Sequence, residues 1–125
     1  MSPTSTGSSG AAQHGALARG AFALAVLVSL AVLFSPGSEV PSAPPGVDKV
    51  VHFSLFAALA LTGRWAGVRR GVLATVLVLY AAVSEVLQAV LPIQRDGTPG
   101  DWVADVLGVL LGLLVWAAVE RRRRR

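Results

Sequence analysis

The run GVLATVLVLYAAVSEVLQAVL, residues 71–91, decides the fold class of this chain. It is almost entirely apolar and 21 residues long, and about 20 helical residues are needed to cross the hydrocarbon core of a bilayer. Glu85 and Gln88 interrupt the run near its end. A charged side chain at the centre of a membrane helix costs about 2.5–3.5 kcal/mol on insertion scales, so Glu85 needs a compensating partner.

The composition of the whole chain indicates a membrane protein. Of its 125 residues, 54% are hydrophobic and 14% are charged, and the mean hydropathy is +0.64. So few charged residues do not suffice for the polar exterior of a soluble domain, and the apolar residues occur in continuous runs. The chain has no cysteine, which excludes disulfides and thiolate ligands. The sequence therefore predicts an integral membrane protein with one domain.

Apolar runs predict an all-α bundle of four transmembrane helices, at residues 16–34, 50–66, 71–91 and 102–119. The second run is the least apolar, because Arg64 lies near its end. For the first run we favour a retained helix over a cleaved signal peptide, because prolines crowd the region where cleavage would occur.

Three parts of the chain follow from this pattern. Residues 1–15 are small and polar, and we expect them to form a disordered tail. Residues 16–119 form the predicted membrane domain. Residues 120–125 form a polybasic tail, which contains five of the eleven basic residues. The pI of about 11.1 thus reflects a topology and lipid-contact signal, and we predict a membrane lipid and no nucleic acid as a partner.

Charge also predicts the orientation of the bundle. With four spans, one side of the membrane receives nine basic residues: Arg19, Arg64, Arg69, Arg70 and Arg121 to Arg125. The other side receives only Lys49 and Arg95, together with six of the seven acidic residues. Because cytoplasmic loops are rich in Lys and Arg, both termini are predicted to be cytoplasmic.

Polar residues of the last three segments are expected to gather in the outer half of the membrane. Asp48 and His52 are four residues apart and share a helical face. Asp101, a predicted N-cap, and Asp105 begin the fourth segment. We expect Lys49, His52 or Arg95 to compensate Glu85. The candidate ligand-binding residues are Asp48, Lys49, His52, Glu85, Gln88, Arg95, Asp101 and Asp105.

Structural interpretations of the same residues stay open. Glu85 and Gln88 could join helices by hydrogen bonds, and Asp48 and Lys49 could anchor a helix at the interface. Gly108 and Gly112 have the small-xxx-small spacing that favours close helix packing.

Motifs for catalysis or cofactor binding are missing from the sequence. Carboxylates and imidazole suit divalent metal ions, but we predict no metal site from His52, Glu85, Asp101 and Asp105. No HExxH-type spacing occurs, and a Lys and an Arg lie among the ligand candidates. The sequence also has no Gly-rich phosphate loop and no recognisable serine nucleophile, so we assign no cofactor and no catalytic residue.

Three stretches together resemble the VanZ-like family of small bacterial membrane proteins: DKVVHFSLFAALAL (48–61), YAAVSEVLQAVLP (80–92) and RDGTPGDWVADVLGVLLG (95–112). The family pattern is Asp-Lys-x-x-His-Phe, then Glu-x-x-Gln in the next helix, an Arg in the following loop and an Asp before a further helix. In this chain the pattern falls on Asp48, Lys49, His52, Phe53, Glu85, Gln88, Arg95 and Asp101. Where the family usually has an asparagine, this chain has Asp105, an acid in place of an amide.

This resemblance implies a multi-pass protein of the bacterial cytoplasmic membrane. The family is named for a protein associated with low-level resistance to teicoplanin. The expected function is binding of a lipid or lipophilic glycopeptide headgroup in an outward-facing polar pocket of the cell envelope. The alternatives are an intramembrane enzyme that uses Glu85 or His52 on an amphiphilic lipid, and an assembly subunit of a membrane complex. No protein partner is identified.

Overall fold

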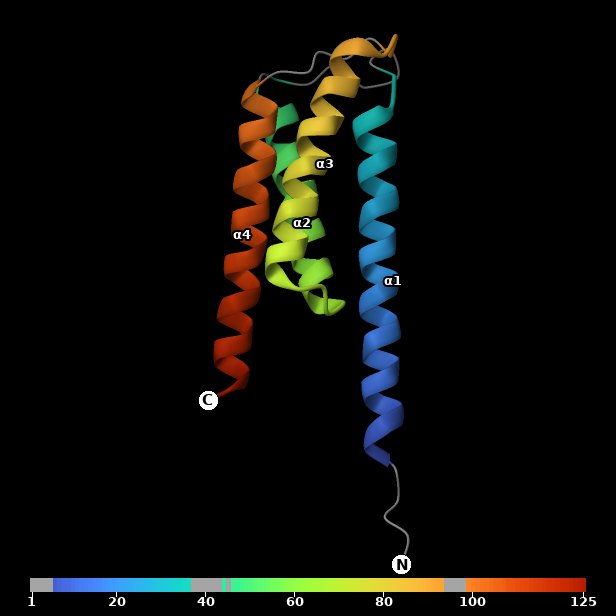
Figure 1. Ribbon diagram of the computed structural model, residues 1–125, viewed down its shortest axis with the longest axis vertical. Helices are drawn as coiled ribbons and strands as arrows, with labels where there is room; N and C mark the ends of the chain where they lie inside the picture. The colour runs from blue at the N-terminus through green and yellow to red at the C-terminus, as the bar shows by residue number, and fades with distance from the viewer. Residues whose placement is uncertain (1–5, 37–43, 45, 94–98) are drawn as a thin grey trace, which may run out of the picture.

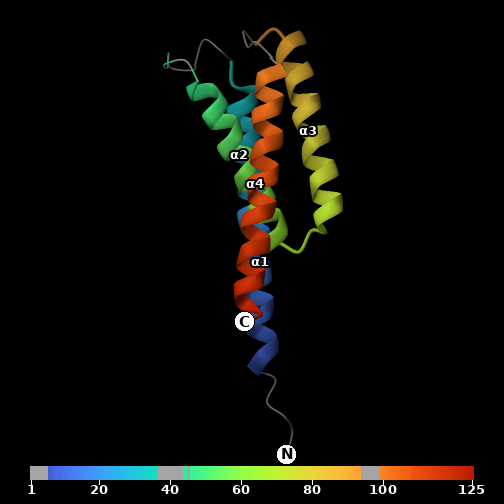
Figure 2. The ribbon, with the colours of Figure 1, turned by 90° about the vertical axis from the view of Figure 1, so that its left-hand side faces the viewer.

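The computed structural model describes residues 6–36, 44, 46–93 and 99–125, and this part of the chain contains four α-helices (Figure 1). They are α1 (Thr6–Phe34), α2 (Val47–Trp65), α3 (Arg70–Val90) and α4 (Pro99–Arg123). The start of α1 and the end of α4 lie toward the same end of the bundle (Figures 1 and 2). The prediction of an all-α fold is confirmed.

The number of helices able to cross a membrane differs from the prediction. By length and composition, three described segments qualify: Gly15–Phe34, Arg70–Val90 and Pro99–Arg123. Helix α2 does not qualify, because its 19 residues include the charged residues Asp48, Lys49 and Arg64. The prediction of four such helices is therefore wrong in this respect: three are long and apolar enough, and the fourth is shorter and more polar.

The described helices expose many large apolar side chains and bury several polar ones, which is unusual for a soluble protein. Leu24, Val86 and Leu114 expose 62%, 60% and 66% of their surface, whereas His52 and Asp105 are 1% and 0% exposed. Soluble proteins rarely expose such extensive apolar surface, and polar groups within a bilayer turn to the interior. This distribution is the one expected for helices that face hydrocarbon.

Helix α2 lies at the centre of the described part of the molecule (Figures 1 and 2). It packs most extensively against α4 and also contacts α1 and α3. A side chain at Gly108 would collide with the backbone oxygen of Phe53, and a Cβ at Gly112 would lie 2.5 Å from the backbone oxygen of Ala57. These two glycines therefore let the backbones of α2 and α4 touch, as the small-xxx-small spacing predicts.

Apolar side chains from all four helices fill the space between them. The buried cluster contains Leu33, Phe56, Leu59, Ala60, Leu73, Leu77, Ala81 and Val109. Phe56 of α2 meets Tyr80 of α3 with ring centroids 5.5 Å apart. A tight turn joins α2 and α3, and Gly67 within it has a φ of +93°, which glycine adopts without steric cost. This core fixes α3 beside α2.

Two helix boundaries differ from the predicted ones. Helix α1 begins at Thr6 and not at residue 16, since no proline ends the helix between these positions. Helix α4 begins at Pro99, a residue whose fixed φ suits the first helical position. Asp101 consequently lies in the first turn of α4 and is not its N-cap.

Replacing Gly108 by alanine tests the contact between α2 and α4. Because the added Cβ meets backbone and not a movable side chain, we expect Gly108→Ala to lower the free energy of unfolding by about 1–3 kcal/mol. Thermal unfolding in detergent micelles measures the change. Gly20→Ala is the matched control, since nothing lies within 4 Å of a Cβ at that position of α1. Equal stability of the two variants would contradict the packing described.

Candidate functional site

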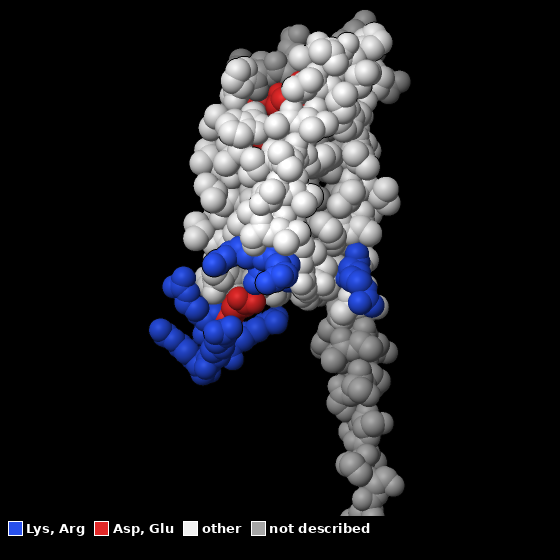
Figure 3. Space-filling view, viewed as in Figure 1, with Lys and Arg blue, Asp and Glu red and all other residues white. Residues whose placement is uncertain are grey.

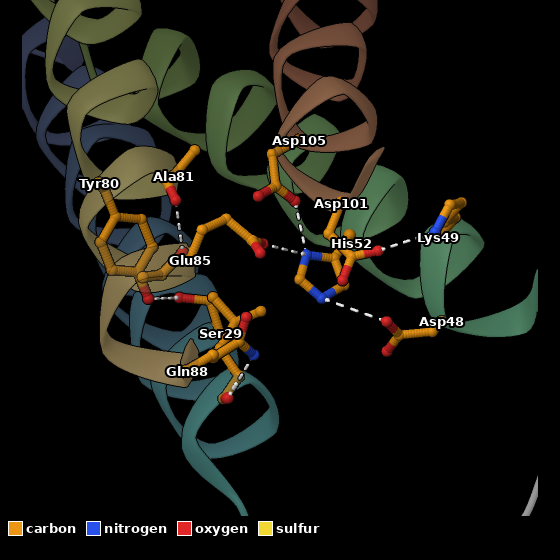
Figure 4. Close-up of polar contacts among 12 residues, drawn as sticks. Ser29, Asp48, Lys49, His52, Tyr80, Ala81, Glu85, Gln88, Asp101 and Asp105 are labelled. Atoms are coloured by element: carbon orange, nitrogen blue, oxygen red, sulfur yellow. Dashed lines mark hydrogen bonds and ion pairs between the residues drawn. The ribbon is translucent and has the colours of Figure 1, made fainter. Parts of the chain in front are cut away.

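Charged and polar residues of α2, α3 and α4 converge near one end of the bundle (Figure 4). The cluster, called the His52 cluster below, consists of Asp48, Lys49 and His52 of α2, Glu85 of α3, and Asp101 and Asp105 of α4. These residues span more than fifty positions of the sequence. Figure 3 shows acidic residues recessed between uncharged ones at this end, while the Lys and Arg residues visible in that view lie toward the other end.

The inner part of the His52 cluster is buried. His52 Nδ1 and Asp105 Oδ1 lie 2.8 Å apart, a hydrogen-bond distance. Glu85 Oε1 lies 3.6 Å from the same ring nitrogen. His52 and Asp105 are 1% and 0% exposed, and Glu85 is 9% exposed. His52, one of the three residues that the sequence suggested for Glu85, thus lies within ion-pair distance of it.

The outer part of the cluster reaches the surface. Asp48 Oδ2 lies 3.8 Å from His52 Nε2, which confirms that these two residues share a helical face. Lys49 Nζ donates a hydrogen bond of 3.2 Å to Asp101 Oδ1. The side chains of Asp48 and Lys49 are 56% and 54% exposed, whereas that of Asp101 is 3% exposed. The exposed side chains of Asp48 and Lys49 thus form the rim of the cluster, and its buried residues form an enclosed centre.

Local helix geometry explains why these residues meet. Asp101 and Asp105 are one helical turn apart and face α2 together. An aspartate side chain is short, so Asp105 reaches His52 only if the two backbones approach closely. Gly108, three residues after Asp105, provides that approach by contacting the backbone at Phe53. The glycine spacing and the polar cluster are parts of one arrangement.

Acidic groups outnumber basic groups in the His52 cluster. It contains four carboxylates against Lys49 and one imidazole. Asp105 Oδ2 is buried and has no hydrogen-bond partner among the described residues. Like charges that converge away from water repel strongly, so such a centre favours an added proton or cation. The arrangement is suited to hold a positively charged group or to move a proton.

One residue predicted for the site stands apart from the cluster, and a second is not among the described residues. Gln88 is buried, and its Nε2 donates a 2.8 Å hydrogen bond to the backbone oxygen of Leu33 in α1. Gln88 thus joins α3 to α1, which is the structural role left open by the sequence. Arg95 lies outside the described residues.

Sequence reasoning missed a second polar contact between helices. Ser29 of α1 and the hydroxyl of Tyr80 in α3 lie 3.0 Å apart, and Ser29 also donates to the backbone oxygen of Val26. The available signal was a serine within the otherwise apolar run of α1. Together with Gln88, this contact attaches α1 to α3.

A cleft of about 370 Å³ lies at the opposite end of the bundle, between α2 and α4. Its lining is mostly apolar and includes Trp65, Trp116 and Arg123. Close by, Glu120 accepts a 2.9 Å hydrogen bond from Trp116 Nε1 and lies 3.5 Å from Arg64 Nη2. The cleft has no carboxylate or imidazole in its lining, so we do not assign the candidate site to it.

Removing the imidazole tests the buried pair. We expect His52→Leu to lower the free energy of unfolding by about 3–5 kcal/mol, because it leaves the Asp105 carboxylate buried without its partner. Adding Asp105→Asn removes the charge at nearly constant size, so the double variant should regain part of the loss. Unfolding in detergent measures both variants. Losses that simply add would show that the two residues do not interact.

No family model, curated protein or solved structure matches this chain. The resemblance to the VanZ-like family therefore stays a prediction that rests on three stretches of sequence. The function has to be inferred from the chemistry of the His52 cluster and from its position at one end of an apolar bundle.

Proposed function

We propose that this protein is a VanZ-like integral membrane protein that binds the polar headgroup of an amphiphile in the His52 cluster. One observation carries the proposal: a buried His–Asp pair with a second carboxylate, that of Glu85, opens through a charged rim onto an apolar surface. A purely structural pair needs neither the excess of carboxylates nor the rim. A lipid or lipophilic glycopeptide headgroup in the cell envelope is the ligand class that we infer.

The rim and its surroundings fit the two parts of an amphiphile. The exposed side chains of Asp48 and Lys49 offer one group of each sign to a polar head. At the same end of the bundle, Val50 of α2 and Val86 and Val90 of α3 are 63%, 60% and 70% exposed. Apolar surface of this kind accepts an acyl chain at little cost, since hydrocarbon contacts it in the membrane in any case. Head and tail would thus bind to adjacent surfaces.

The proposal includes an orientation in the bacterial cytoplasmic membrane. We infer that both termini are cytoplasmic, that α2 crosses the membrane against α4, and that the His52 cluster faces outward. Support comes from the distribution of charge, because the Lys and Arg residues visible in Figure 3 gather at the end opposite the acidic recess, while Lys49 lies at the recess. Packing of α2 against all three other helices buries His52, while Asp48 and Lys49 stay half exposed in the first turn of α2, at the proposed membrane surface.

Single cysteines test the orientation cleanly, because the chain has none of its own. In intact cells, we expect an impermeant maleimide to label Pro44→Cys, before α2, and not Arg69→Cys or Arg124→Cys. All three residues are exposed, so all should react after the membrane is opened. Labelling of Arg69→Cys in intact cells would contradict an α2 that crosses the bilayer.

Lipids that copurify with the protein test the binding function. We expect mass spectrometry to find an amphiphile enriched with the wild-type protein and reduced at least about tenfold with Glu85→Gln, which removes a charge from the site. Glu120→Gln is the matched control, since Glu120 lies at the other end of the bundle beside Arg64. The same lipid profile in all three preparations would exclude headgroup binding at the His52 cluster.

The 2.8 Å contact between His52 and Asp105 also supports a second candidate function. A carboxylate that orients an imidazole is a common arrangement for general acid–base catalysis. An intramembrane enzyme that acts on an amphiphilic lipid would yield a chemically altered product, and Glu85→Gln or His52→Asn would abolish its formation in a folded protein.

A further inference from the structure

The buried part of the His52 cluster has the donor atoms and spacing of a metal site. A nitrogen of His52 and one carboxylate oxygen each from Glu85 and Asp105 lie within 4.8 Å of one another. The distances from His52 Nδ1 are 2.8 Å to Asp105 Oδ1 and 3.6 Å to Glu85 Oε1. Two ligands that each lie about 2.0–2.2 Å from one ion are separated by roughly 3–3.6 Å, so small side-chain adjustments would suffice.

We propose that His52, Glu85 and Asp105 bind a divalent transition-metal ion. One ligand comes from each of α2, α3 and α4. Beyond the cluster itself, the second oxygen of Asp105 indicates a missing ligand: Oδ2 is buried and has no hydrogen-bond partner within the described ranges. In Figure 4 the Asp105 carboxylate points toward the Glu85 carboxylate and the His52 ring.

Charge balance favours this ion. A single N–H at His52 Nδ1 can donate to only one acceptor fully, whereas two carboxylates approach that nitrogen. A neutral imidazole, two carboxylates and a divalent ion sum to zero charge. The ion would thus neutralise both acids in a region where unbalanced charge is expensive.

A carboxylate also lies near the second ring nitrogen of His52, within ion-pair distance. With Nδ1 on the ion, Nε2 carries the proton, and Asp48 Oδ2 lies 3.8 Å from Nε2. Metal-ligating histidines commonly donate their other N–H to a carboxylate, which fixes the ring orientation. Lys49, whose charge counted against a metal in the sequence, is engaged with Asp101 at 3.2 Å and is half exposed.

The donor set indicates the class of ion. One imidazole and two carboxylates suit Zn²⁺, Mn²⁺ or Co²⁺, whereas Mg²⁺ and Ca²⁺ prefer oxygen ligands alone. Three protein ligands leave coordination positions open. The inference deepens the proposed headgroup site by adding an ion to its inner residues, and its test measures bound metal and not bound lipid. Its test contains no added lipid, so each proposal can fail without the other.

Equilibrium dialysis of the purified protein tests the site. Wild-type protein in detergent is stripped with a chelator, dialysed against Zn²⁺ or Mn²⁺, and its metal content is measured by elemental analysis. We expect about one ion per chain, and an affinity at least about tenfold weaker in Asp105→Asn and His52→Gln. Glu120→Gln, with a carboxylate removed at the opposite end, should bind like the wild type.

Two further readouts do not depend on how well a variant folds. Wild-type protein loaded with Co²⁺ should show visible absorption bands of nitrogen- and oxygen-ligated cobalt. Saturating Zn²⁺ should raise the unfolding temperature of the wild type, because the ion binds only the assembled helices. Absence of stoichiometric binding to the stripped wild type, or equal binding by wild type and Asp105→Asn, would overturn the proposal.

Discussion

The close contact between α2 and α4 is the constraint on which the other features depend. Gly108 and Gly112 bring the two backbones together, and only at this separation does the short side chain of Asp105 reach His52. The same contact lets α4 cover α2, whose charged residues would be costly against lipid. Close packing and polar chemistry therefore reinforce each other: the glycines permit the ionic cluster, and the cluster makes the helix pair specific.

Helix α3 completes the arrangement from the other side. Glu85 adds a carboxylate to the enclosed centre, while Gln88, one turn further on, is directed to the backbone of Leu33 in α1. A pair that looks like one motif in sequence thus serves two purposes. The first residue enriches the cluster in negative charge, and the second binds the peripheral helix α1 to the bundle. The bundle can therefore hold several carboxylates close together while Gln88 keeps α1 attached to α3.

Much of this structure follows from sequence, and the exceptions have physical causes. Apolar runs predict the helices, and the spacing of Asp48 and His52 predicts their shared face. Only three helices, and not the predicted four, are long and apolar enough to cross a membrane, because α2 combines an apolar run with three charged residues. The pairing of Asp101 with Lys49 depends on the register of α4 against α2, which no local pattern encodes. The contact between Ser29 and Tyr80 likewise could not be predicted, because it depends on how α1 packs against α3.

The short turn at Gly67 has a consequence for biosynthesis. It joins α2 and α3 into a hairpin that already contains His52 and Glu85 before α4 is translated. If the hairpin inserts as a unit, Glu85 already lies beside the imidazole of His52 before α4 is added. Asp105 arrives afterwards with α4 and closes the cluster. The order of these residues along the chain thus allows the cluster to form in two steps, first between α2 and α3 and then with α4.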